Sequence, residues 1–154
     1  MRKMLKSLAL AAGIILSGSA LANAATVSLQ IANSSPEYIS FYGAPTCTNC
    51  TTTTAAIINS GSSGTSTATI VAGDTSMTYS IGYYGTYTVG TNHFVQKGCR
   101  ATITVSVAAD GTVTNATGGW VPFVGNPTCS TVSSPQIVGS TVIWSVRLNA
   151  TNQP

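Results

Sequence analysis

Residues 101–107 read Ala-Thr-Ile-Thr-Val-Ser-Val, an alternation that places every apolar side chain on one face of an extended chain and every hydroxyl on the other. This period of two predicts a β-strand with one buried face. Asp110-Gly111 follows, a pair that accepts the positive φ angles of a tight turn, and Val113 begins a returning strand. The sequence therefore predicts a β-hairpin over these residues.

The same alternation recurs in residues 27–31, 68–70, 77–83 and 142–148, whereas no stretch repeats apolar residues at helical spacing. About seven to nine short strands with turn signals between them predict an all-β fold. An antiparallel β-sandwich stabilised by disulfides is the first choice and a small β-barrel the second. Residues 118–139 contain three prolines and are expected to form a long loop broken by short strands.

The chain begins with the features of a secretory signal peptide. Arg2, Lys3 and Lys6 precede an apolar run over residues 8–16, which is shorter than the roughly 20 residues that cross a bilayer. Ala22-Asn23-Ala24 offers the small-x-small pattern of a cleavage site. Residues 1–24 are therefore expected to be removed, and residues 25–154 to form one β-sandwich domain in the periplasm, outside the cell or on its surface.

Charge is scarce in the expected domain. Three basic and three acidic residues remain after the leader, so the net charge is 3 − 3 = 0. Nucleic-acid binding is excluded as a function, because it depends on basic residues that neutralise phosphates. A chain without net charge does little to oppose self-association, which is a possible property of this protein. The six residues are Lys97, Arg100, Arg147, Glu37, Asp74 and Asp110.

The cysteines are even in number and follow the leader. Cys47, Cys50, Cys99 and Cys129 predict two disulfides, for which three pairings exist. Proximity in the sequence slightly favours Cys47 with Cys50 and Cys99 with Cys129. The Cys-x-x-Cys motif lacks the helix start and βαβ pattern of a thiol oxidoreductase, and a zinc site would require a second such pair. No metal and no cofactor are expected.

The sequence lacks the combinations of residues that form well-known active sites. His93 is the single histidine, no Gly-x-Ser-x-Gly motif occurs, and three scattered carboxylates form neither a hydrolytic pair nor a calcium site. A non-enzymatic protein is therefore expected. An unidentified hydrolase that uses His93 as its general base is the remaining enzyme alternative.

Aromatic residues supply the candidates for ligand binding. Tyr84 lies on the opposite face of its predicted strand from Tyr79 and Tyr83, and Trp120 and Phe123 fall in the expected loop. Tyr84, Trp120 and Phe123 are therefore predicted to be surface residues that contact a carbohydrate, a lipid or a protein.

These features favour a secreted or cell-surface binding or assembly module of the adhesin kind. A membrane-active protein is one alternative, for which the small secreted aegerolysins offer an analogy in size without a shared motif. A fimbrial-type structural subunit is another, because the alternating strand through Leu148 is similar to strands exchanged between such subunits.

Overall fold

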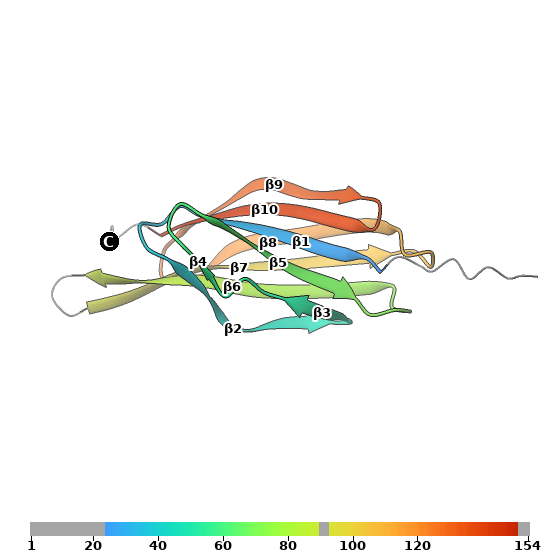
Figure 1. Cartoon of the computed structure of the whole chain (residues 1–154), viewed down its shortest axis with the longest axis horizontal. Coiled ribbons are helices and arrows are strands. Elements are labelled where there is room, and N and C mark those ends of the chain that lie inside the picture. The colour runs from blue at the N-terminus through green and yellow to red at the C-terminus, as the bar shows by residue number, and fades with distance from the viewer. Residues whose placement is uncertain (1–23, 90–92, 151–154) are drawn as a thin grey trace, which may run out of the picture.

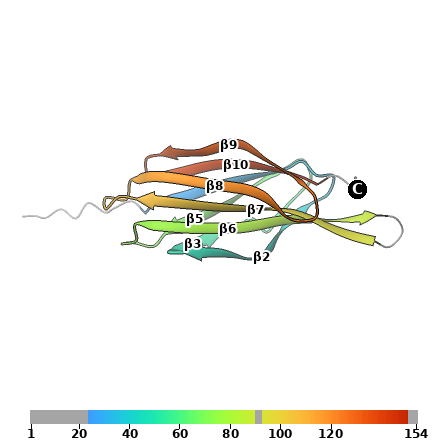
Figure 2. The same ribbon diagram turned by 180° about the vertical axis from the view of Figure 1, so that it is seen from behind.

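The computed structural model describes residues 24–89 and 93–150, which form two β-sheets packed face to face (Figures 1 and 2). The predicted β-sandwich is confirmed. The predicted leader lies outside the described residues except for Ala24. Among the described residues there is no candidate for a membrane-spanning helix. The strands are β1 (Thr26–Asn33), β2 (Ile39–Thr48), β3 (Cys50–Thr53), β4 (Ile57–Ile58), β5 (Ser63–Ile70), β6 (Ser76–Val89), β7 (His93–Val107), β8 (Val113–Val124), β9 (Thr128–Val138) and β10 (Thr141–Asn149).

Five strands form each sheet. Sheet A has the order β3-β5-β1-β10-β9, and sheet B has the order β4-β2-β6-β7-β8. All neighbouring strands are antiparallel except β1 and β10, which are parallel and bring the first and last strands together inside sheet A. The described ten strands exceed the expected number because β4 has only two residues and residues 118–139 contribute to two long strands.

The core lies between the two sheets and consists of the alternating apolar residues. The predicted inward faces of all five alternating segments are confirmed. Tyr83 is buried among them, but its hydroxyl lies 2.7 Å from Ser66 Oγ and donates a hydrogen bond of 2.8 Å to the carbonyl of Ala55, so this polar atom is satisfied. The inward side chains include Val27, Leu29, Ile31, Met77, Tyr79, Ile81, Ala101, Ile103, Val105, Val142, Trp144, Val146 and Leu148.

The hairpin predicted around Asp110-Gly111 joins β7 to β8. Gly111 has a φ of 86°, and the amide of Ala108 donates a hydrogen bond of 2.8 Å to the carbonyl of Thr112. The amide of Thr112 donates to the Asp110 carboxylate at 2.9 Å, which lowers the pKa of that carboxyl. Asp110 is therefore a turn residue.

The prediction of a long loop over residues 118–139 is wrong. These residues complete β8 and form all of β9, with residues 125–127 between the strands. Pro122 and Pro135 lie inside them, and both strands are at the edge of a sheet. A proline is tolerated there because one side of an edge strand forms no ladder hydrogen bonds.

Two disulfides join sheet A to sheet B. Cys47 of β2 pairs with Cys50 of β3, with 5.4 Å between their Cα atoms. Cys99 of β7 pairs with Cys129 of β9, with 5.9 Å between theirs. The pairing favoured by sequence proximity is confirmed, and such bonds are typical of proteins that mature in an oxidising environment.

One end of sheet B narrows to two strands. β6 and β7 run beyond their neighbours (Figures 1 and 2), because the pairing of β2 with β6 ends at Tyr84 and that of β8 with β7 ends at Gly98. Outward-facing side chains from all four strands meet where this narrowing begins.

Candidate ligand-binding surface

The outer face of sheet B carries rows of hydroxyl groups. In register across four strands lie Thr48, Thr78, Thr104 and Thr117. The Oγ1 atoms of Thr78 and Thr104 are 3.2 Å apart, so neighbouring hydroxyls in this row form a hydrogen bond. These side chains point away from the core because their strands alternate with the buried residues described above.

A second row lies closer to the end where sheet B narrows. It contains Thr46, Ser80 and Thr102, and Ser80 Oγ lies 3.0 Å from Thr102 Oγ1. Such contacts restrict the rotamers of exposed hydroxyls, which lowers the entropy lost when a ligand orders them.

Next to this row, three aromatic rings from three strands form a cluster that we call the aromatic patch. The centroid of Tyr42 lies 5.4 Å from that of Tyr84 with an interplanar angle of 88°, and 5.1 Å from that of Phe123 with an angle of 54°. Both are favourable geometries for aromatic pairs. Tyr42 is 47% exposed, whereas Tyr84 and Phe123 are half-buried. The patch therefore offers Tyr42 to the solvent and holds it between two other rings.

Two glycines allow Phe123 to lie against the sheet. A Cβ atom at Gly82 would be 3.0 Å from Phe123 Cε1, and one at Gly98 would be 2.8 Å from the same atom. A side chain at either position would push the ring outward. β6 and β7 thus provide a glycine bed, defined as Gly82 and Gly98, on which the phenyl ring of β8 rests.

Arg100 joins the aromatic patch to a small hollow. Its guanidinium carbon lies 4.9 Å from the Phe123 ring centroid, within the range of a cation–π interaction. The hollow has a volume of about 110 Å³, and its lining includes Tyr42, Thr46, Ser80 and Arg100. One cation, one exposed ring and two hydroxyls therefore converge at one place on an otherwise flat face.

The structure brings together two of the three predicted contact residues. Tyr84 and Phe123 both belong to the aromatic patch, and Tyr84 faces outward as predicted. The prediction that Trp120 lies in a surface loop is wrong. Trp120 is only 6% exposed, because β8 turns it inward, and its indole N–H donates a hydrogen bond of 2.9 Å to the carbonyl of Arg147. Its position gives no support to a role in ligand contact.

Tyr42 and Arg100 were missed as candidates. The sequence showed Tyr42 only as one of several aromatic residues near residue 40, and Arg100 only as one of few cations. Their proximity depends on the pairing of Tyr42 with Gly82 and of Gly82 with Arg100, which no local pattern reveals.

The described chain offers few groups for chemistry. Glu37, Asp74 and Asp110 lie between strands, and in residues 24–89 and 93–150 no three His, Cys, Asp or Glu side chains are grouped to hold a metal ion. All four cysteines are oxidised. The side chain of His93, the general base of the enzyme alternative, lies outside the described residues.

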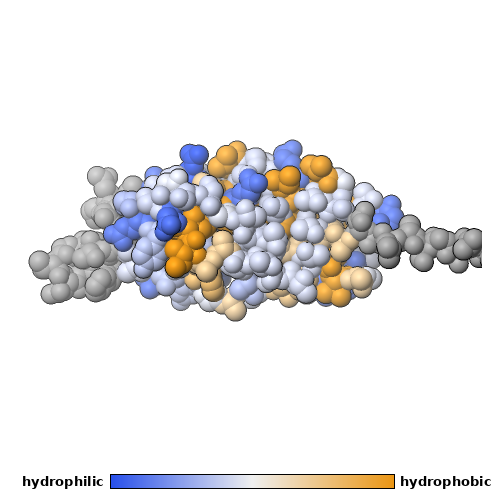
Figure 3. Space-filling view, viewed as in Figure 1, coloured by the Kyte–Doolittle hydropathy of each residue, from blue (hydrophilic) through white to orange (hydrophobic). Residues whose placement is uncertain are grey.

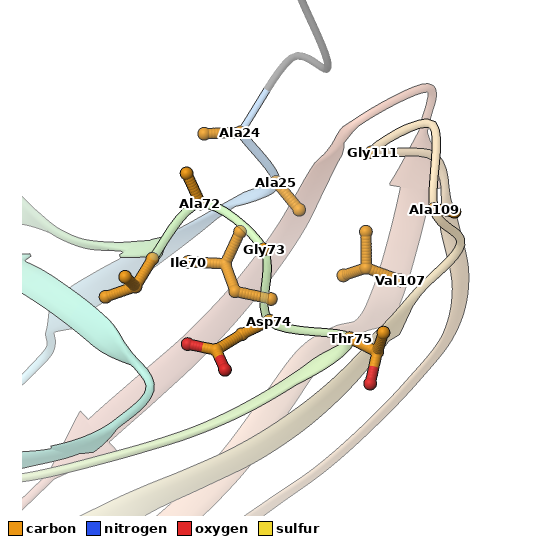
Figure 4. A pocket seen from close by; sticks show the side chains of 11 residues that line it. Ala24, Ala25, Ile70, Ala72, Gly73, Asp74, Thr75, Val107, Ala109 and Gly111 are labelled. Atoms are coloured by element: carbon orange, nitrogen blue, oxygen red, sulfur yellow. The ribbon is translucent and has the colours of Figure 1, made fainter.

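A second hollow of about 210 Å³ lies near Ala24 and Ala25 (Figure 4). Small apolar side chains line most of it, and the carboxylate of Asp74 points away from the two alanines (Figure 4). It has neither an aromatic ring nor a cation in its lining. We therefore place the candidate site at the aromatic patch.

The face in Figure 3 is largely pale, with small separate hydrophilic and hydrophobic areas. No protein-family model and no curated protein matches this sequence. The function must therefore be inferred from the surface chemistry.

Proposed function

We propose that this protein is an exported, non-enzymatic, adhesin-like module that binds carbohydrate on the outer face of sheet B. The observation that carries the proposal is the half-exposed ring of Tyr42, held by Tyr84 and Phe123 beside a hollow lined with hydroxyl groups. A sugar ring presents an apolar C–H face and a rim of hydroxyls. The aromatic patch matches the first by stacking, and Thr46 and Ser80 match the second by hydrogen bonding.

The shape of the surface favours a glycan that lies across it. The hollow of about 110 Å³ is small compared with the roughly 300–1,000 Å³ of pockets that enclose small molecules. The threonine rows continue from the hollow along the sheet. A polysaccharide chain or a large surface glycan can contact both, whereas a single sugar cannot be enclosed.

Export is part of the proposal. The two disulfides support an oxidising destination, and the amino-terminal sequence has the features of a signal peptide. The fimbrial alternative finds no support in the geometry, because β10 already pairs with β1 on one side and β9 on the other within its own chain. Membrane binding through the aromatic patch is an outcome of the test below.

The test compares two exposed tyrosines. Binding to immobilised polysaccharides and to liposomes is measured for the wild type, for Tyr42→Ala and for Tyr38→Ala. Tyr38 is 58% exposed but lies before β2 and outside the aromatic patch, so it is a matched control. We expect glycan binding that Tyr42→Ala weakens at least about tenfold, as for a central aromatic contact, and that Tyr38→Ala leaves unchanged.

Three results would contradict the proposal. They are an absence of binding to every polysaccharide, an equal loss in the two tyrosine variants, and binding to liposomes alone. The last would favour the membrane-active alternative. Thermal melting of each variant shows whether a loss of binding reflects a loss of folding.

A further inference from the structure

We infer that the glycan is anionic and that Arg100 receives its carboxylate or sulfate group. This inference rests on the proposed function and names the class of ligand. It is carried by the position of Arg100, which lines the hollow and also lies over the Phe123 ring of the aromatic patch.

Sheet B carries no negative charge of its own. None of its five strands contains an aspartate or a glutamate. The three carboxylates of the described chain lie between strands, and none of them lines the hollow. An anionic ligand at Arg100 would therefore meet no acidic side chain in the lining.

The guanidinium is oriented by the same ring that forms the patch. Its central carbon lies 4.9 Å from the centroid of Phe123, and Phe123 is itself placed by Gly82 and Gly98. A cation–π contact uses the charge of the guanidinium and leaves its N–H donors able to bind a ligand. These donors match the two oxygens of a carboxylate or a sulfate ester in a bidentate arrangement.

The other cations provide a comparison. Lys97 is on the inward-facing side of β7 and only 8% exposed. Arg147 is exposed on β10, in sheet A, and lines a hollow without an aromatic ring. Arg147 therefore has the same charged guanidinium as Arg100 but no counterpart of Phe123 beside it. This makes Arg147 the matched control.

The experiment uses three polysaccharides with related backbones: a neutral galactan, a polygalacturonate and a sulfated galactan. Binding is measured for the wild type, Arg100→Gln, Arg100→Lys and Arg147→Gln at physiological salt. We expect the wild type to bind at least one anionic polymer about tenfold more tightly than the neutral one, as one bidentate charged contact allows. Arg100→Gln should lose this preference, Arg100→Lys should keep only part of it, and Arg147→Gln should keep all of it.

The two anionic polymers identify the group, because preference for the polygalacturonate indicates a carboxylate and preference for the sulfated galactan indicates a sulfate. Equal affinity for all three polymers would overturn the inference and leave the proposed function standing. An equal loss in Arg100→Gln and Arg147→Gln would also overturn it, since the attraction would then be non-specific. If the wild type binds none of the three polymers or any other glycan, the proposed function itself fails. Unchanged near-ultraviolet circular dichroism shows that each variant keeps its fold.

Discussion

The outer faces of both sheets carry rows of threonine residues, but they differ in their aromatic residues. Sheet A has a threonine row of its own, in which Thr51, Thr69, Thr26 and Thr141 are in register across four strands. The Oγ1 atoms of Thr26 and Thr69 are 3.4 Å apart, similar to the hydroxyl contacts of sheet B. The aromatic patch and its glycine bed occur on sheet B alone.

Both faces carry threonine rows, so these rows alone do not distinguish the proposed binding surface. Because this protein has few charged residues, the hydroxyl rows on both faces supply polar groups that interact with water. A hollow of about 420 Å³ on sheet A is larger than the hollow beside Arg100, but its lining includes Gln30, Ser145 and Arg147 and no aromatic ring. The single aromatic residue in the strands of sheet A is Trp144, which is buried. The two faces are therefore distinguished by the residues that line their hollows, and not by the volume of those hollows.

The largest effect on stability is expected from the two disulfides that join sheet A to sheet B. Replacing both Cys99 and Cys129 by serine opens a long loop and should lower the free energy of unfolding by about 3–4 kcal/mol. The same change at Cys47 and Cys50 releases a short loop and should cost about 2 kcal/mol. Urea denaturation measures both. A greater loss from the short loop would contradict this order.

The glycine bed gives the most direct test of the contrast between the faces. Gly98→Ala would place a Cβ 2.5 Å from the carbonyl oxygen of Tyr83, which is backbone and cannot move easily. We expect a loss of about 2–3 kcal/mol in the free energy of unfolding, as for overpacking. Gly119→Ala on the same sheet is the control, because no atom lies within 4 Å of its added Cβ. Equal stability of the two variants would show that Gly98 does not lie as close to Tyr83 and Phe123 as described.

Alkaline pH should affect the stability through sheet B, since the strands of sheet A contain no tyrosine. Burial raises the pKa of Tyr79 to about 12 and also raises that of Tyr83. The unfolded chain ionises these groups near pH 10, so the stability is complete below about pH 10 and is lost as the pH rises towards the folded value. We expect a loss of about 1 kcal/mol from Tyr79 by about pH 11, and a further loss in the same direction from Tyr83.

Urea midpoints between about pH 8 and pH 11 measure this loss. Tyr79→Phe should reduce the slope with which the urea midpoint falls as the pH rises. Among the described residues the hydroxyl of Tyr79 has no hydrogen-bond partner, so phenylalanine should be tolerated at neutral pH. An unchanged slope in Tyr79→Phe would contradict the assignment.

The smallest effects are expected from single threonines. Thr102→Val on sheet B and Thr67→Val on sheet A should each change the free energy of unfolding by less than about 0.5 kcal/mol, as for most surface substitutions. Glycan binding should separate them, since Thr102 contacts Ser80 at the hollow whereas Thr67 lies on the other face. We expect a loss of about two- to threefold for Thr102→Val alone. Equal binding by both variants would show that the hydroxyl row takes no part.

Residues 101–113 and residues 118–139 show how far local patterns could predict the fold. The first stretch was predicted correctly because the strand alternation and the Asp110-Gly111 turn are determined by side chains next to each other in the chain. The second was taken as a loop because proline normally interrupts a strand. Whether Pro122 and Pro135 are tolerated depends on whether their strands lie at an edge, and this is a property of the assembled sheet.

Residue types and their spacing were sufficient to predict the all-β class, the inward apolar faces, the scarcity of charge and the presence of enough cysteines for two disulfides. Each of these follows from residue type and from a period of two, which are local properties. The paired strands were needed to show that Trp120 is buried and that four other side chains meet, namely Tyr42, Tyr84, Arg100 and Phe123. These four residues come from four different strands. Their proximity depends on strand order and register, which arise from pairing between segments far apart in the chain.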